Sequence, residues 1–293
     1  MSPPPVSVVT GANSGIGRAA TIHLARQGHE VYGTVRAAAK AEKLVAMAEQ
    51  AGVDVHLVEL DVADDDSVRG GFEQILEAAG RVDHLVNNAG VGANGVAEEC
   101  ASSLYLDAFN VNVVGAVRCV QAVLPQMRER GSGSIVNITS VAGRVAAIGQ
   151  SPYFTSKFAL EGLSEGLAQE LAPFGIRVVI VEPGVTKSAI FAKNTDAPNT
   201  TGVYDAHYRR MFQFYAAGMA AATDPFEVAD VIHHAITTSD PQLRYAVSWG
   251  GRELVEGRAG VADSDWVALG AIPDDGEYYR RFADLFGLDI APA

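Results

Sequence analysis

The regular alternation of short apolar runs with helical patterns constrains the fold of this 293-residue chain more than any other feature. The apolar runs are rich in β-branched residues and fall at residues 6–10, 29–36, 53–60, 83–87, 134–140, 177–182 and 244–248. Helical patterns separate them, including residues 37–50 and a segment from Asp64 that opens with three acids, as a helix N-terminus favours. Repeated βα units predict a parallel sheet covered by helices on both faces. Right-handed crossovers then predict an α/β protein with a doubly wound sheet of about seven strands, in a single domain over residues 1–293.

Charge and composition argue against several classes of partner. The net charge is −13, and such a field repels phosphate backbones and anionic lipid. Two cysteines, Cys100 and Cys119, are too few for a disulfide scaffold. Residues 1–10 lack the features of a signal peptide, and no run approaches the ~18 apolar residues that cross a bilayer. We therefore expect a cytoplasmic protein with a small-molecule partner, no nucleic acid and no membrane insertion.

A glycine-rich turn, TGANSGIG at residues 10–17, follows the first predicted strand and opens a helix. Gly11 permits a tight turn, Gly15 lets the backbone approach a pyrophosphate, and Gly17 allows close packing of helix on sheet. Unpaired N–H groups at the start of the helix can bind phosphate. A three-glycine turn alone could be an ordinary strand-to-helix connection, but after the first strand of a doubly wound sheet it indicates a Rossmann-type dinucleotide site.

From Thr10 to about Ser188 the sequence resembles the single-domain short-chain dehydrogenases/reductases. The GxxxGxG spacing of residues 10–17 is similar to that family's cofactor loop, and residues 153–184 are particularly similar to hydroxysteroid and retinol dehydrogenases. Three further motifs match those of the family in the same order. Asp61-Val62 matches the pair that contacts adenine, and Asn87-Asn88-Ala89-Gly90 matches the NNAG that closes the fourth strand. Pro183-Gly184 matches the pair beside the nicotinamide. Taken singly, Asp61 could begin a loop and the two asparagines could be turn residues.

Four residues fall at the positions of that family's catalytic tetrad: Asn112, Ser140, Tyr153 and Lys157. Tyr153 would be the general acid or base, which requires its pKa to fall by about three units from about 10. Lys157, one helical turn on, would stabilise the phenolate and bind the ribose. Ser140 would orient the substrate oxygen, and Asn112 resembles the residue that holds a proton-relay water. Each alone could be an ordinary polar residue; together, behind a dinucleotide loop, they favour catalysis.

The end of the second predicted strand favours NADP(H) over NAD(H). An acid there would repel a 2′-phosphate, but the chain has Thr34 and Val35, followed by Arg36, whose guanidinium suits a phosphate. The alternative is a solvated surface arginine. The expected cofactor-binding residues are Gly11, Asn13, Ser14, Gly15, Ile16, Gly17, Arg36, Asp61, Val62, Asn88, Ala89, Gly90, Tyr153, Lys157, Pro183, Gly184, Thr186 and Ser188. We interpret the seven histidines as scattered, and we expect no metal site.

Two segments bear on substrate and assembly. Residues 189–222 read as a long substrate loop, with aromatic and Met side chains gathered in residues 204–215. These rings indicate a lid over a bulky lipophilic substrate, or equally packing within the domain or a subunit contact. Gly162 and Gly166 lie on one helix face and predict close approach of a second copy, hence a homodimer or homotetramer, unless they face the sheet. The tail ends in an aromatic helix near residues 277–286.

These observations predict an NADP(H)-dependent oxidoreductase that interconverts a ketone or aldehyde and an alcohol. Two alternatives are weaker. A nucleotide-sensing regulator would bind NADP(H) without turnover, but such proteins generally lose the tyrosine or the lysine, and this chain keeps both. An epimerase or dehydratase of the extended branch normally carries a larger C-terminal domain than the roughly 50 residues that follow the last strand here.

Overall fold

The structure, a computed structural model that describes residues 3–188 and 197–292, is built on a seven-stranded sheet in the order β3-β2-β1-β4-β5-β6-β7. Every neighbouring pair of strands is parallel. The strands are β1 Val6–Val9, β2 Glu30–Val35, β3 His56–Glu59, β4 His84–Asn87, β5 Gly133–Ile138, β6 Ile176–Pro183 and β7 Arg244–Val247. The predicted Rossmann-type sheet is therefore confirmed. Its strand order reverses between β1 and β4, where open α/β sheets bind ligands at the carboxyl ends of the strands.

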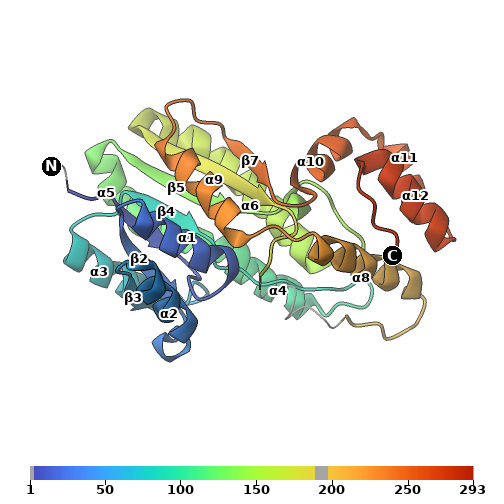
Figure 1. Ribbon diagram of the computed structural model, residues 1–293, viewed down its shortest axis with the longest axis horizontal. Helices are drawn as coiled ribbons and strands as arrows, with labels where there is room; N and C mark the ends of the chain where they lie inside the picture. The colour runs from blue at the N-terminus through green and yellow to red at the C-terminus, as the bar shows by residue number, and fades with distance from the viewer. Residues whose placement is uncertain (1–2, 189–196, 293) are drawn as a thin grey trace.

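Helices cover both faces of the sheet (Figure 1). On one face α1 (Gly15–Arg26) and α9 (Pro225–Thr237) pack together over the central strands, with α2 (Glu42–Ala51) beside α1. On the other face, α3 (Asp65–Ala79), α5 (Gly115–Arg130) and α6 (Ser151–Leu171) enclose a second core. The predicted helix at residues 37–50 is instead a 3₁₀ turn, Ala38–Lys40, followed by α2.

The helix before β5 is longer than the others and irregular in its middle. α4 (Ser102–Phe109) runs through a π-helical turn, Asn110–Val114, directly into α5. By length and composition this helix, Ser102–Arg130, could cross a membrane, so the expectation that no segment has that capacity is wrong. Core helices of water-soluble proteins pass the same test, and 44% of its most apolar stretch is buried against the rest of the fold.

The prediction of a loop over residues 189–222 is wrong for residues 205–220, which form a helix. Residues 189–196 lie outside the described residues, but α8 spans Asp205–Ala220. Tyr208, Met211 and Tyr215 are spaced i, i+3 and i+7, which places them on one helix face. Tyr208 and Met211 are buried and pack against Val96. The aromatic residues that the sequence analysis assigns to a loop therefore have helical spacing and lie on α8.

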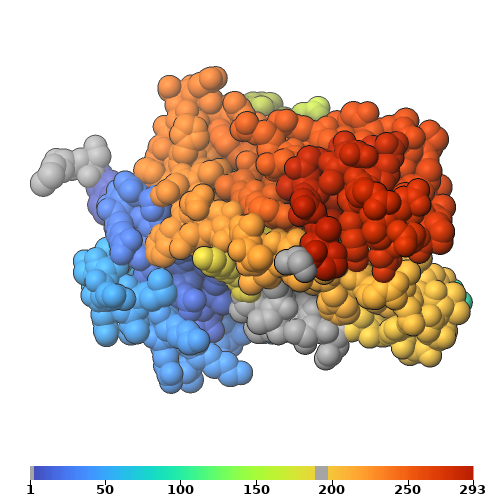
Figure 2. Space-filling view, turned by 45° about the vertical axis from the view of Figure 1, so that its right-hand side comes forward, coloured from blue at the N-terminus to red at the C-terminus, as the bar shows by residue number. Residues whose placement is uncertain are grey.

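Three short helices complete the chain beyond β7: α10 (Gly251–Gly260), α11 (Asp263–Gly270) and α12 (Asp275–Phe286). Of these, the sequence predicted only α12. Together with α8 they gather at one end of the molecule, beyond the carboxyl ends of the strands (Figures 1 and 2). Their apolar side chains form a cluster with Val141 and Val145, which follow β5. The tail therefore builds part of the wall around the sheet's ligand-binding edge.

Candidate active site

The glycine loop has the geometry that its three glycines permit. Gly11 and Gly15 have φ values of +66° and +52°, in the left-handed region that favours glycine. A Cβ on Gly17 would lie 2.3 Å from Asn88 Nδ2 and 2.4 Å from Gly11 O. The N-cap residue of α1, Ser14, makes no side-chain capping bond, so the first turn of α1 keeps its N–H groups open toward the cavity. This end of the helix is therefore suited to an anionic group.

The NNAG motif holds this loop in place. Asn88 Nδ2 donates to the carbonyl oxygens of Thr10 and Gly11, at 2.8 and 3.3 Å. Thr10 Oγ1 accepts from the backbone N–H groups of Asn88 and Ala89. Asn87 Nδ2 donates to Asn137 Oδ1 on the neighbouring strand. Asn88 thus joins β4 to the glycine loop with its side chain, while Ala89 and Gly90 line the cavity.

The predicted adenosine side lies at the carboxyl ends of β2 and β3. Asp61 Oδ1 accepts from Ala63 N at 3.0 Å, and Asp61 and Val62 both line the cavity. Arg36 is exposed just beyond β2 and also lines the cavity, as does Lys40. No acidic side chain ends β2, and the cations Arg36 and Lys40 share this part of the site with the carboxylate of Asp61.

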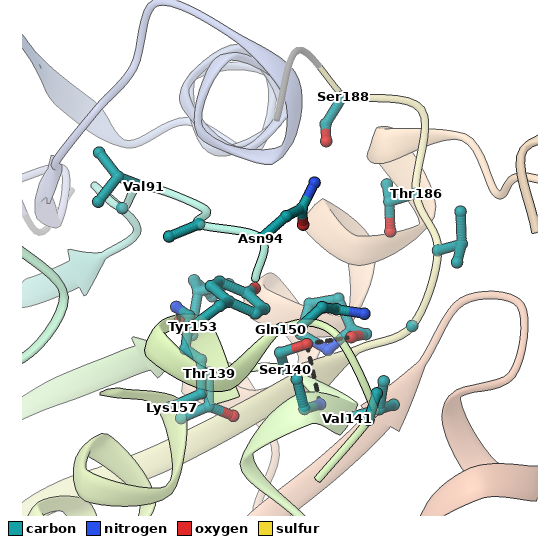
Figure 3. Close-up of a pocket in the computed structure, with 18 of the residues that line it drawn as sticks. Val91, Asn94, Thr139, Ser140, Val141, Gln150, Tyr153, Lys157, Thr186 and Ser188 are labelled. Carbon is teal, nitrogen blue, oxygen red and sulfur yellow. Dashed lines mark hydrogen bonds between the residues drawn. The ribbon is translucent and has the colours of Figure 1, made fainter. Parts of the chain in front are cut away.

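The residues expected to be catalytic meet at the carboxyl ends of β5 and β6 (Figure 3). Ser140, which follows β5, donates to Pro183 O at 3.3 Å and accepts from Ala142 N at 3.1 Å. Tyr153 lies in the first turn of α6 and opens into the same cavity. Lys157, one turn on, is buried, and its Nζ donates to Ile138 O at 2.9 Å and lies 5.8 Å from the centre of the Tyr153 ring.

The fourth expected residue, Asn112, lies in the π-helical turn. π-bulges are frequent at functional sites because they turn a side chain away from the regular helix. Asn112 Oδ1 accepts from Val91 N at 2.8 Å, and its Nδ2 donates to Val91 O and to Ser156 Oγ. A Cβ on Gly90 would lie 3.2 Å from Asn112 Oδ1 and 3.8 Å from Lys157 Nζ, so Asn112 and Lys157 converge on this glycine.

In the protein without cofactor, the pKa of Tyr153 is shifted in the direction opposite to the one that the expected catalytic role requires. Burial raises the pKa of the Tyr153 hydroxyl above its ordinary value, and a hydrogen bond with Ser140 opposes the rise. Burial also lowers the pKa of Lys157 to about 8, against the opposing charge of Glu161. The fold without cofactor therefore favours a protonated Tyr153. That state suits a proton donor, whereas a phenolate would need additional positive charge nearby.

The segment after β6 forms the opposite wall. Gly184 N donates to Val247 O, and a Cβ on Gly184 would lie 2.0 Å from Trp249 O, so no side chain fits there. The hydroxyl groups of Thr186 and Ser248 form a hydrogen bond with each other, with their oxygen atoms 2.7 Å apart. Pro183, Gly184, Thr186 and Ser188 all line the cavity.

One continuous cavity of about 890 Å³ joins these parts. Beyond Tyr153 its walls are mainly apolar and come from the β5–α6 connection, α8 and the C-terminal helices; they include Val145, Ile148, Met211, Phe214, Leu254, Trp266, Leu269, Tyr278, Phe282 and Ile290. Two polar residues in this part, Asn94 and Gln150, were missed by the sequence analysis, whereas Tyr215 belongs to the aromatic cluster of residues 204–215 that it identified. Gln150 had a signal, since it stands one helical turn before Tyr153; Asn94 and Tyr215 meet only in the fold, where Tyr215 Oη donates to Asn94 Oδ1 at 2.8 Å.

Histidines gather elsewhere in the molecule. His23, His29, His84 and His233 form a chain of neighbouring rings, with centroids 5.5–5.7 Å apart. The interpretation that the histidines are scattered is therefore wrong in space. Within residues 3–188 and 197–292, no group of three His, Cys, Asp or Glu side chains is arranged to hold a metal ion.

Comparison with known proteins assigns the family. The family model for short chain dehydrogenases matches residues 5–199. An uncharacterized oxidoreductase of Bacillus subtilis, YusZ, is 35% identical over 271 residues, which cover 90% of this chain and 96% of that protein. Human 17-beta-hydroxysteroid dehydrogenase type 1 is 37% identical over 82% of this chain and 76% of its own length.

Solved structures agree. A short-chain dehydrogenase from Streptomyces avermitilis superposes with a TM-score of 0.79 at 36% identity, covering 93% of this chain and all of that one. An actinorhodin polyketide ketoreductase solved with NADPH has a TM-score of 0.70 at 30% identity, over 80% of this chain and 90% of its own. With the glycine loop, the doubly wound sheet and the cavity at its switch point, these likenesses support nucleotide cofactor binding. The chain belongs to the short-chain dehydrogenase/reductase superfamily and is an oxidoreductase that acts on CH–OH groups.

Proposed function

We propose that this protein is an NADP(H)-dependent reductase or dehydrogenase that interconverts a bulky, lipophilic ketone or aldehyde with its alcohol. Tyr153 donates the proton to the carbonyl oxygen in reduction and accepts it in oxidation. Ser140 orients that oxygen, and Lys157 supplies positive charge beneath Tyr153 and binds the ribose. Asn112 holds the water through which the proton reaches solvent.

The observation that carries this proposal is the single cavity that contains both the glycine loop and Tyr153. Gly11 and Gly15 would hold the pyrophosphate of the cofactor, and Pro183 and Gly184 would flank its nicotinamide, since all four residues line the same cavity as Tyr153 and Ser140. The region beyond them is lined by aromatic and aliphatic side chains of α8, α10, α11 and α12. Such a lining favours a substrate with a large apolar body, because its burial removes apolar surface from water.

The reaction is tested with NADPH, NADH and a panel of aldehydes, ketones and alcohols, followed by nicotinamide absorbance. We expect lipophilic cyclic ketones to have higher kcat/KM than short polar carbonyl compounds. A preference for short polyols or sugars would refute the substrate class. Absence of turnover despite tight NADPH binding would favour the nucleotide-sensing regulator instead.

Cofactor preference rests on Arg36. Its exposed guanidinium lies at the cavity's adenosine end, where it can make charge-assisted hydrogen bonds to a 2′-phosphate. One such contact is worth about 1.5–3 kcal/mol, or about ten- to hundredfold in Kd. Arg36→Ala should weaken NADPH binding selectively and leave NADH binding unchanged. Equal losses for both cofactors, or tighter NADH binding by the wild type, would refute the assignment.

Assembly and location complete the proposal: a single domain that works as a cytoplasmic homodimer or homotetramer. A Cβ on Gly162 or Gly166 would meet nothing within 4 Å, so these glycines do not face the sheet. Exposed apolar side chains also occur on α4 and α6, which are in contact, namely Leu106, Phe109 and Phe158. Light scattering at micromolar concentration tests this proposal, and a monomer would contradict it.

A further inference from the structure

Gln150 is a buried polar side chain in the substrate part of the cavity with no assigned role. It is the residue before α6, where polar side chains often cap the helix, but its side chain makes no capping bond. The residue is only 7% exposed and lines the cavity. Figure 3 shows it beside Ser140, opening into the same space as Ser140 and Tyr153.

Hydrogen bonds on both sides of Gln150 hold its backbone in place, so the fold determines where its side chain enters the cavity. Gly95 N donates to Gly149 O at 2.6 Å, and Ser151 N donates to Gly95 O at 3.0 Å. Gly95 and Gln150 form an isolated parallel bridge between the loop after β4 and the start of α6. These bonds hold the backbone of Gln150 in place at the wall of the cavity that Ser140 also lines.

The carboxamide itself has no hydrogen-bond partner within residues 3–188 and 197–292, although an amide can make up to four such bonds. Water can satisfy it while the cavity is open. A purely apolar substrate that displaced this water would leave the amide buried and unpaired, which disfavours binding. A substrate with an oxygen at this place would restore the lost hydrogen bond. Sites of this kind discriminate strongly against analogues that lack the polar group.

We propose that Gln150 is a specificity-determining residue that recognises a second oxygen, a hydroxyl or carbonyl, close to the reacting carbon of the substrate. This inference deepens the proposed function and rests on it. Gln150 is the N-cap residue of α6, three residues before Tyr153, and both side chains line the same part of the cavity. An oxygen one or two bonds from the reacting carbon therefore lies within reach of the amide while the carbonyl contacts Tyr153. The preferred substrates are α-hydroxyketones, α-diketones or β-dicarbonyl compounds with an apolar body.

The test compares 2-hydroxyacetophenone with propiophenone, which differ only in a hydroxyl in place of a methyl group. For wild type and Gln150→Met, kcat/KM with NADPH is measured on both ketones and expressed as the ratio of the two values. Dividing one ratio by the other removes the difference in intrinsic reactivity between the ketones. We expect the variant's ratio to fall about 10- to 100-fold, mainly through loss on the hydroxyketone, because methionine preserves size and removes the hydrogen bond.

Ile148→Val, an apolar change in the same wall, is the matched control and should alter both ketones alike. The Kd for NADPH should stay unchanged in both variants, since neither residue lies near the glycine loop. A second arm needs no turnover: the Kd values of 1-phenyl-1,2-ethanediol and 1-phenyl-1-propanol for the NADPH complex, in which no hydride can be transferred from the alcohol, should show the same Gln150-dependent ratio. Equal ratios for wild type and Gln150→Met in either arm would overturn the assignment. If ketone turnover itself is absent, the proposed function fails and the binding arm still decides the role of Gln150.

Discussion

At the scale of single residues, the proposed chemistry depends on the phenol of Tyr153, whose pKa is raised by burial. Tyr153→Phe removes the proton donor and leaves the ring to fill the same space. We expect kcat to fall by about 10²–10⁴, the usual contribution of proton transfer, with the Kd for NADPH nearly unchanged. Steady-state kinetics and cofactor titration measure the two effects.

Tyr105→Phe is the matched control for this experiment. The hydroxyl of Tyr105 is 2.6 Å from Ser151 Oγ at the start of α6, but Tyr105 does not line the cavity. This variant should keep nearly full activity. A Tyr153→Phe enzyme with more than about a tenth of wild-type kcat would show that another group donates the proton.

Charge behind the active-site lysine offers a second test at this scale. Glu161 is buried one turn after Lys157, and its Oε1 has no hydrogen-bond partner in the described structure. Glu161 Oε2 pairs with Arg244 at 3.0 Å. Arg244 also lies close to the buried Glu182, which pairs with Arg144 as well. The negative charge of Glu161 raises the pKa of Lys157 against the effect of burial.

Glu161→Gln should therefore lower the pKa of Lys157 below its value of about 8, so that the ammonium is lost at lower pH. The alkaline limb of the kcat/KM profile for reduction should move to lower pH by a measurable fraction of a unit or more. Glu165→Gln, which removes an exposed partner of the same Arg244, is the control and should leave the profile in place. An unchanged profile for Glu161→Gln would exclude this electrostatic role.

At the scale of elements, the parts predicted from sequence are those set by local pattern. All seven strands were predicted, most clearly those that are continuous buried apolar runs, as in β6 (Ile176–Pro183). The glycine turn was recognisable because Gly11 and Gly15 need positive φ. α8 was missed, although Tyr208, Met211 and Tyr215 have helical spacing, because their number suggested a lid more strongly than their period suggested a helix.

The walls of the cavity and the pKa of Tyr153 could not be predicted, since both arise from contacts between distant segments. α8 and α12 are joined by Arg210, a guanidinium only 3% exposed, which donates to Asp275 Oδ1 and stacks on Tyr278 at 4.3 Å. These residues are 65 positions apart in the sequence. No local pattern indicates such a pair, nor the burial that raises the pKa of Tyr153.

This connection between α8 and α12 gives a prediction at the element scale. Asp275→Asn removes the counter-ion of the buried Arg210; because Asp275 itself is partly exposed and also pairs with Arg209, we expect a cost of about 1–3 kcal/mol. We expect a lower free energy of unfolding and a higher KM, because α12 loosens where it lines the cavity. Urea denaturation and kinetics measure both effects.

The control is Asp284→Asn, an exposed aspartate on the same helix. It should change the free energy of unfolding by no more than about 0.5 kcal/mol. If Asp275→Asn proved equally neutral, Arg210 would be held by its carbonyl contacts at Ile272 and Pro273 and by the tyrosine ring alone.

At the scale of the whole molecule, the histidine cluster makes stability depend on pH. His29 and His84 belong to the sheet side of the cluster, while His23 and His233 come from α1 and α9, which pack together. Burial and mutual repulsion lower the pKa of His29 to about 4. Burial lowers the pKa of His84 to about 4 as well, and Asp83 opposes this shift. The cluster is therefore neutral in the folded protein at physiological pH.

An unfolded histidine titrates near pH 6.5, so below that pH the unfolded chain takes up protons that folded His29 and His84 do not accept. Their contribution to stability is complete above about pH 6.5 and declines as pH falls toward 4. Between pH 7 and 5 the loss of unfolding free energy should reach up to about 4 kcal/mol for the two histidines together.

Urea unfolding at several pH values measures this loss, and a His29→Gln/His84→Gln double variant should show a much flatter dependence of the unfolding free energy between pH 7 and 5. His56→Gln, an exposed histidine outside the cluster, should retain the wild-type slope. Parallel curves for wild type and the double variant would show that the acid sensitivity arises elsewhere.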